Sequence, residues 1–166
     1  MAPVAQQEHA SPELNRKRFQ YIQGLNRSDR TIAFDIFLSH KRSESQDLAA
    51  RLYDRLVGEG YRVFLDREDL QELGKLRAHV RETGKLVVLL TPAIFQSYWC
   101  MAELCEAVAS SVEVLPVIIE GAKWGPGGSR GFPDPELDVP LTMKLEGVEI
   151  RPREAARIAF THRIAL

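Results

Sequence analysis

The chain has 166 residues, enough for one well-buried core and too few for two ordinary domains. Hydrophobic residues make up 45% and charged residues 27% of it, a balance typical of soluble globular proteins. A net charge of −1 without a long basic run argues against a nucleic-acid-binding or anionic-membrane-binding protein. The longest apolar stretch, Leu86–Leu90, is far too short to span a bilayer.

The two cysteines, Cys100 and Cys105, bear on the redox compartment. Because they are five residues apart on a predicted helix, their side chains point in directions that differ by roughly 140°, and an internal disulfide is not expected. The N-terminus lacks the basic start and continuous apolar core of a signal peptide. These features predict reduced thiols and a cytoplasmic protein.

Residues 1–30 are polar and mixed in character, and we expect a tail with one short helix there. Ser11 followed by Pro12 is a suitable start for that helix, because serine caps helix N-termini and proline is favoured in the first turn. A single domain is then expected over residues 31–166.

Short buried strands alternate with helices from residue 32 onward. The predicted strands are Ala33–Leu38, Arg62–Leu65, Leu86–Leu90, Val112–Ile119 and Val148–Ile150. The predicted helices run from a capping box at Ser43 to Gly58, and over Lys75–Glu82, Tyr98–Ser110 and Glu154–Ile164. The two long loops are Asp66–Gly74, which is charged, and Gly121–Pro140, which is rich in Gly and Pro and has room for one helical turn.

This alternation predicts an α/β fold. We expect a flavodoxin-like doubly wound sheet of five parallel strands in the order 2-1-3-4-5, with helices on both faces. The apolar run Leu86–Leu90 supports this fold, because such runs are typical of strands buried within a parallel sheet. Asp35 lies within the first strand and is expected to be a structural hydrogen-bonding residue.

Sheets of this type bind ligands beyond the carboxyl ends of their strands. Ser39, His40, Lys41 and Arg42 follow the first predicted strand, and Asp66 follows the second. Neither G-x-G-x-x-G nor the Walker pattern occurs, which disfavours a redox dinucleotide enzyme and an ordinary nucleoside triphosphatase. The histidines show no ligand spacing, so no metal site is expected.

Trp99 and Glu103 lie four residues apart and therefore share one face of the helix predicted from Tyr98. An apolar stripe on that helix faces the sheet, and it consists of Cys100, Leu104 and Val108. Glu103 lies at the border of this stripe, where a carboxylate can reach a cleft. The alternative is an ordinary glutamate on the helix surface.

Four segments of the chain carry a resemblance in combination. They are Phe34–Ser39; Phe64–Asp66 followed by Gly74–Lys75; Ser97–Cys100 followed by Glu103–Leu104; and Leu115–Ile118. Together they resemble the Toll/interleukin receptor (TIR) domain family, from about Ala33 to Ile164. In the catalytic branch of that family, the glutamate that Glu103 matches is essential for cleaving NAD.

The resemblance implies an NAD(+) nucleosidase that cleaves the nicotinamide–ribose bond, in immune or cell-death signalling. The product would be ADP-ribose, a cyclic ADP-ribose, or both. NAD is then the substrate, and no cofactor is expected. The resemblance also implies association with other TIR domains, including copies of this chain, through the loop after the second strand, which the family calls the BB loop.

Trp99 can stack on the nicotinamide or adenine ring, or it can be a tryptophan at the edge of the core. Lys41 and Arg42 can hold the diphosphate, or they can lie in a solvated turn.

Ser39 and His40 are expected to shape the ribose pocket, although for His40 the interpretation as a cap at the end of its strand is preferred. Asp66 is expected at the same rim. Gly74 and Lys75 can close over the ligand from the BB loop.

Two alternatives to an NAD-cleaving enzyme are open. One is a non-catalytic TIR scaffold that recruits other TIR domains. The other is a nucleoside-phosphate glycosidase that uses the same glutamate on a smaller substrate. Trp99, Glu103 and the Lys41–Arg42 pair favour NAD cleavage over the scaffold, because a scaffold does not need a Trp and a Glu one turn apart at a pocket rim.

Overall fold

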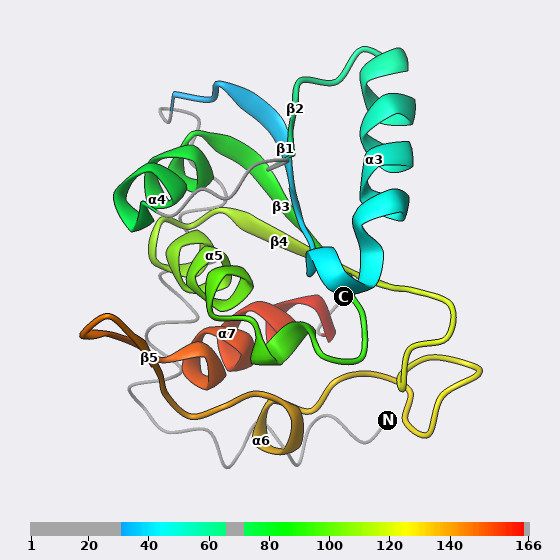
Figure 1. Cartoon of the computed structure of the whole chain (residues 1–166), viewed down its shortest axis with the longest axis vertical. Coiled ribbons are helices and arrows are strands. Elements are labelled where there is room, and N and C mark those ends of the chain that lie inside the picture. The colour runs from blue at the N-terminus through cyan, green and yellow to red at the C-terminus, as the bar shows by residue number, and fades with distance from the viewer. Residues whose placement is uncertain (1–30, 66–71, 165–166) are drawn as a thin grey trace.

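A computed structural model of the protein describes residues 31–65 and 72–164, with side chains described up to residue 160. The helix expected within residues 1–30 and the rim residue Asp66 lie outside the described residues. Within them, strands and helices alternate as predicted, and Figure 1 shows helices on both faces of a sheet.

Four parallel strands form this sheet, in the order β2-β1-β3-β4. They are β1 (Phe34–Ser39), β2 (Val63–Leu65), β3 (Thr83–Leu90) and β4 (Glu113–Ile118). Ser39, the last residue of β1, pairs with Val88 of β3. Because the strands all run in one direction, Ser39 lies at the carboxyl edge of the sheet, on the same side as the segment that follows β3.

β3 begins at Thr83, earlier than the predicted Leu86, because Thr83 already pairs with Phe34 of β1. Gly84 allows this close pairing, since a Cβ at its position would lie 3.0 Å from the Asp35 carbonyl oxygen. Residues 86–90 are all buried, as their apolar run predicts.

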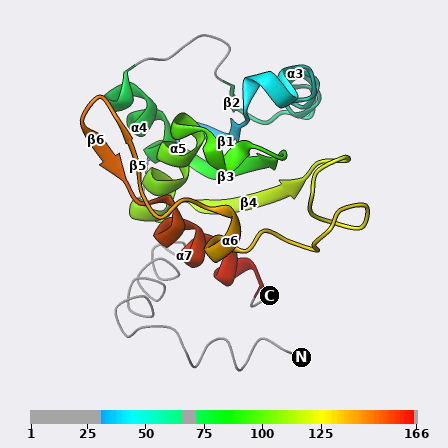
Figure 2. The same cartoon turned by 60° about the horizontal axis from the view of Figure 1, so that its bottom comes forward.

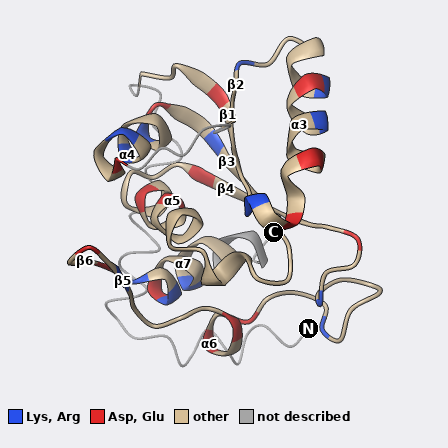
Figure 3. Ribbon diagram, viewed as in Figure 1, with Lys and Arg blue, Asp and Glu red and all other residues tan. Residues whose placement is uncertain are grey.

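Helices cover the two faces of the sheet unequally (Figure 2). One face carries α4 (Leu73–Arg81), α5 (Tyr98–Ala109) and α7 (Pro152–Ile164). The other carries α3 (Arg42–Gly58), whose outer side bears charges of both signs (Figure 3). No helix in residues 31–65 or 72–164 combines the length and apolarity that crossing a membrane requires.

The predicted fifth strand is not part of the sheet within the described residues. Val148–Ile150 does form a strand, β6, but it pairs antiparallel with β5 (Met143–Leu145) in a separate two-stranded sheet. Glu146 and Gly147 join the two strands with φ values of 50° and 82°, which are the positive angles of a tight two-residue hairpin turn. Only Ile150 of β6 is buried, so the segment is too short and too exposed to extend the parallel sheet.

The start of α3 also differs from the prediction, because no capping box forms at Ser43. The helix begins at Arg42 after Lys41, and no side chain caps it. The Ser43 hydroxyl instead accepts a hydrogen bond from Lys41 Nζ at 2.7 Å. Ser45 has φ −147° and ψ 24°, outside the helical region, so one short turn that includes Glu44 precedes the regular helix.

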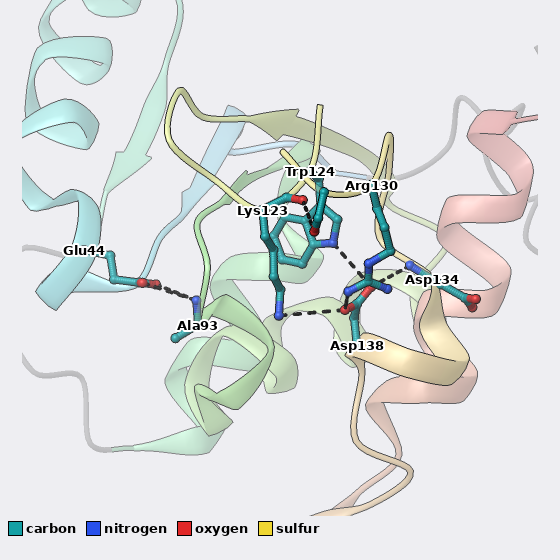
Figure 4. A network of polar contacts seen from close by, with 8 residues as sticks. Glu44, Ala93, Lys123, Trp124, Arg130, Asp134 and Asp138 are labelled. Carbon is teal, nitrogen blue, oxygen red and sulfur yellow. Dashed lines mark hydrogen bonds and ion pairs between the residues drawn. The ribbon is translucent and has the colours of Figure 1, made fainter. Parts of the chain in front are cut away.

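A polar network orders the Gly- and Pro-rich loop before the hairpin (Figure 4). We call it the Asp138 network, after the residue at the end of α6 (Pro135–Asp138). The Asp138 carboxylate accepts hydrogen bonds from Trp124 Nε1 at 3.3 Å, the Asp134 amide at 2.8 Å and the Arg130 guanidinium. Burial raises the pKa of Asp138, but these hydrogen bonds outweigh it and hold that pKa below its ordinary value. The loop is therefore built around a buried carboxylate.

Candidate active site

The candidate site is centred on a buried pair, Ser39 and Glu103. Ser39 is 1% exposed and Glu103 is 6% exposed. The Ser39 hydroxyl donates a hydrogen bond of 2.6 Å to Glu103 Oε1. The structure thus brings together two residues that the sequence predicted separately for the site, and it joins the end of β1 to α5.

Glu103 is more buried than its predicted place at the border of an apolar stripe. α5 packs against the sheet and α4 on one side and against α7 on another, so its buried residues include both Ala102 and Leu104 beside Glu103. A carboxylate in such surroundings needs polar partners, since burying it without them is costly. Ser39 is one such partner, and the surface interpretation of Glu103 is wrong.

Two further contacts fix the start of α5 against β1. The Ser97 side chain caps the helix by accepting a hydrogen bond from the Cys100 amide at 3.3 Å. The Cys100 thiol donates to the His40 carbonyl oxygen at 3.3 Å. Burial, followed by the nearby charge of Glu103, raises the pKa of Cys100 to about 12, so the thiol keeps its proton and remains a donor.

Both cysteines, Cys100 and Cys105, are free thiols, as predicted from their spacing. Burial also raises the pKa of Cys105, to about 11.

Trp99 is half-buried at the start of α5 and packs against the edge of the core. Its ring meets that of Tyr98 edge-on, with centroids 5.7 Å apart. The core-edge interpretation of Trp99 therefore holds. Stacking of its remaining surface on a ligand ring stays a prediction.

Lys41 and Arg42 follow Ser39 at the carboxyl edge and are both partly exposed. His40 lies between them and Ser39, and its carbonyl group, rather than its ring, makes the contact with α5. The role of Lys41 and Arg42 in holding a diphosphate stays a prediction, as does that of the His40 ring.

Gly74 and Lys75 lie in the first turn of α4 and not in a loop. The helix starts at Leu73, earlier than predicted, because Leu73 packs against the core together with Leu76 and Val80 of the same helix. Lys75 makes an exposed ion pair with Glu72 at 3.4 Å.

Glu44 is a residue of this region that the sequence did not point to. Its carboxylate accepts hydrogen bonds from Thr91 Oγ1 at 2.7 Å and from the Ala93 amide at 3.1 Å. Thr91 directly follows β3, but nothing in the pattern around Glu44 indicated this contact. The described part of the chain contains no group of three or more His, Cys, Asp or Glu residues that could hold a metal ion.

Three curated relatives match the chain. "Probable 2' cyclic ADP-D-ribose synthase BdTIR" of Brachypodium distachyon is 28% identical over 92 residues, covering 52% of this chain and 41% of the relative. "NAD(+) hydrolase TirS" of Staphylococcus aureus is 27% identical over 114 residues, covering 66% and 40%. "NAD(+) hydrolase sarm1" of Drosophila melanogaster is 30% identical over 102 residues, covering 54% and 7%. The chain thus spans less than half the length of each of these relatives.

Among solved structures, the TIR domains of the activated Roq1 resistosome are 22% identical and cover 55% of this chain and 60% of theirs, with a TM-score of 0.48. The sequence model of the TIR domain family matches residues 36–137 of this chain. This match covers more than half of the chain and includes Ser39 and Glu103. The chain therefore belongs to the TIR domain family.

Proposed function

We propose that this TIR domain cleaves the bond between nicotinamide and ribose in NAD. The observation that carries the proposal is the buried Glu103 carboxylate, oriented by the Ser39 hydroxyl at the carboxyl edge of the sheet. This is the edge at which doubly wound sheets bind their ligands. The names of the curated relatives, two NAD(+) hydrolases and a probable cyclic ADP-ribose synthase, support the same chemistry.

The proposed reaction needs one carboxylate. As the nicotinamide–ribose bond breaks, its electron pair leaves with the nicotinamide, and positive charge develops on the ribose ring. A carboxylate near that ring stabilises the transition state more than the ground state. Because the nicotinamide is already cationic in NAD, it leaves as a neutral molecule without being protonated.

A nucleophile then completes the reaction. Water adds to the ribose carbon and loses a proton, which gives ADP-ribose. Attack by the adenine of the same molecule gives a cyclic ADP-ribose instead. Glu103 can also accept hydrogen bonds from ribose hydroxyls, as glycosidase carboxylates do.

The burial of Glu103 strengthens its contribution. In a site shielded from water, a fixed charge interacts more strongly with a developing charge than it does in solvent. The Ser39 hydrogen bond holds the carboxylate in one orientation, so little reorganisation is needed as the ribose becomes positive.

The test is to incubate the purified chain with NAD and to identify the products by mass spectrometry. We expect free nicotinamide together with ADP-ribose or a cyclic ADP-ribose. Nucleoside monophosphates, tested in parallel, distinguish the alternative glycosidase. A chain that cleaves none of these compounds at high concentration or under crowding, yet associates with TIR domains, would instead be the non-catalytic scaffold.

A further inference from the structure

Glu44 connects the two segments that carry the candidate site, and Figure 4 shows its side chain pointing toward the Ala93 amide. Both carboxylate oxygens take part, since Oε1 accepts from Thr91 Oγ1 at 2.7 Å and from the Ala93 amide at 3.1 Å, and Oε2 lies 3.2 Å from the same amide. We call these three residues the Glu44 clamp. Thr91 is buried directly after the end of β3, so the clamp is anchored at the carboxyl edge of the sheet.

The path of the chain explains why the clamp matters for the site. Glu44 follows Ser39 by five residues, in the short turn before the kink at Ser45. On the other side, Thr91 and Ala93 lead through the 3-10 helix η1 (Ile94–Gln96) directly into α5, which carries Glu103. The clamp therefore ties the segment after Ser39 to the segment before Glu103.

Two other hydrogen bonds connect these segments: the Ser39–Glu103 bond, which is buried, and the Cys100–His40 bond, which is partly buried. Glu44 itself is exposed, so the Glu44 clamp lies on the outer side of the same junction. Water can replace the exposed hydrogen bond to the Ala93 amide at small cost, whereas the buried Thr91 hydroxyl loses its acceptor when Glu44 is removed. The clamp therefore aligns the two segments and also makes a modest contribution to stability.

We propose that Glu44 is a positioning residue: its contacts with Thr91 and Ala93 hold the end of β1 and the start of α5 in the arrangement in which Ser39 orients the Glu103 carboxylate. The effect of Glu44 on turnover rests on the NAD cleavage proposed above. Displacing a reacting group by about 1 Å can cost about a hundredfold in rate, so a distant clamp can affect catalysis.

The variant Glu44→Ala tests the proposal, with Asp47→Ala as its matched control. Asp47 is an exposed carboxylate on the same helix, within one turn of Glu44. We expect kcat for NAD cleavage to fall about tenfold to about a hundredfold in Glu44→Ala, with KM nearly unchanged and a small fall in the thermal midpoint from the Thr91 hydroxyl that loses its acceptor. Asp47→Ala should match the parent. An unchanged kcat in Glu44→Ala, or an equal fall in Asp47→Ala, overturns the proposal.

A double-mutant cycle with Ser39→Ala distinguishes positioning from a separate structural effect. If Glu44 acts through the Ser39–Glu103 pair, then Glu44→Ala costs less kcat in the Ser39→Ala background than in the parent. Costs that simply add in the two backgrounds contradict this route.

Hydrogen–deuterium exchange tests the alignment without any substrate. The Cys100 and Met101 amides bond to Ser97 at 3.3 Å and 3.0 Å in the first turn of α5 and not to the Glu44 carboxylate. They should exchange faster in Glu44→Ala than in Asp47→Ala. If the parent does not cleave NAD, the proposed function fails and the exchange alone decides: faster exchange supports the alignment role, and unchanged exchange overturns it.

Discussion

Replacing Glu103 by Gln is the most direct test of the candidate site, because it removes a charge and keeps the size of the side chain. The Gln carbonyl oxygen can still accept the Ser39 hydrogen bond that Glu103 Oε1 accepts at 2.6 Å. Loss of a preorganised electrostatic contact of this kind costs a factor of about 10² to 10³ in rate, or about 2.7 to 4 kcal/mol of transition-state stabilisation. We expect that loss in kcat for NAD cleavage.

The same substitution should change stability much less. A hydrogen bond to a charged group contributes about 1.5 to 3 kcal/mol and a neutral one about 0.5 to 1.5 kcal/mol, so weakening the Ser39 contact costs about 1 to 1.5 kcal/mol. Because Glu103 is only 6% exposed, removing its charge also relieves the cost of burying a carboxylate, which offsets part of this loss. The free energy of unfolding should therefore fall by no more than about 1.5 kcal/mol.

The assay is kcat measured by product release, beside a thermal unfolding curve for each variant. Glu106→Gln is the control, because it makes the same change on the same helix, where Glu106 pairs with Arg81 at 3.2 Å and away from Ser39. It should keep nearly full turnover. If the Glu103 variant cleaves NAD as fast as the parent, the reasoning from the buried pair is wrong.

Two further predictions follow from ion pairs and hydrogen bonds of the structure, and a third follows from the family. The hydrogen bonds from Arg62 and Arg157 hold the pKa values of Asp35 and Glu136 below their ordinary values. The stability that these two carboxylates provide is therefore complete above their unfolded-state pKa and is lost as the pH falls through their folded-state pKa. Urea unfolding from pH 7 to pH 3 should show this loss below about pH 4, and the loss should be smaller in Asp35→Asn. Asp138→Ala should lower the free energy of unfolding by about 2 to 4 kcal/mol, because it leaves Arg130 and Trp124 Nε1 without their shared acceptor. A loss under about 0.5 kcal/mol in a denaturant titration would contradict the structural role of the Asp138 network. Activity should rise faster than linearly with protein concentration if NAD cleavage needs self-association, and a constant specific activity in a protein with a monomeric mass in solution would count against that need.

The sequence predicted the elements with long apolar runs well. β3 contains the run Leu86–Leu90, and α5 starts at Tyr98 as predicted because Ser97 caps it. It also predicted Ser39 and Glu103 for the site. It did not predict their direct bond, because the rotation of α5 about its axis depends on how α4 and α7 pack around it.

The sequence also contains a signal that β4 is an edge strand of a four-stranded sheet. β4 contains Pro116, which has no amide hydrogen and is therefore typical of an edge strand. This proline predicts that β4 lies at an edge of the sheet, so that Val148–Ile150 does not pair with β4 and forms the hairpin with β5 instead. The contact of Glu44 with Thr91 and Ala93 could not be predicted from the sequence, because it depends on the kink at Ser45. No local pattern indicates the φ of −147° at that residue.

The Ser39–Glu103 hydrogen bond also constrains how the protein acquires its site. The two residues are 64 positions apart, so no local segment can hold them together, and closing a loop of that length costs conformational entropy. The pair requires β1 to be paired with β3 and α5 to be docked on the sheet. A partly folded chain therefore lacks the oriented carboxylate, and any activity of this site should disappear in denaturant no later than the fold itself.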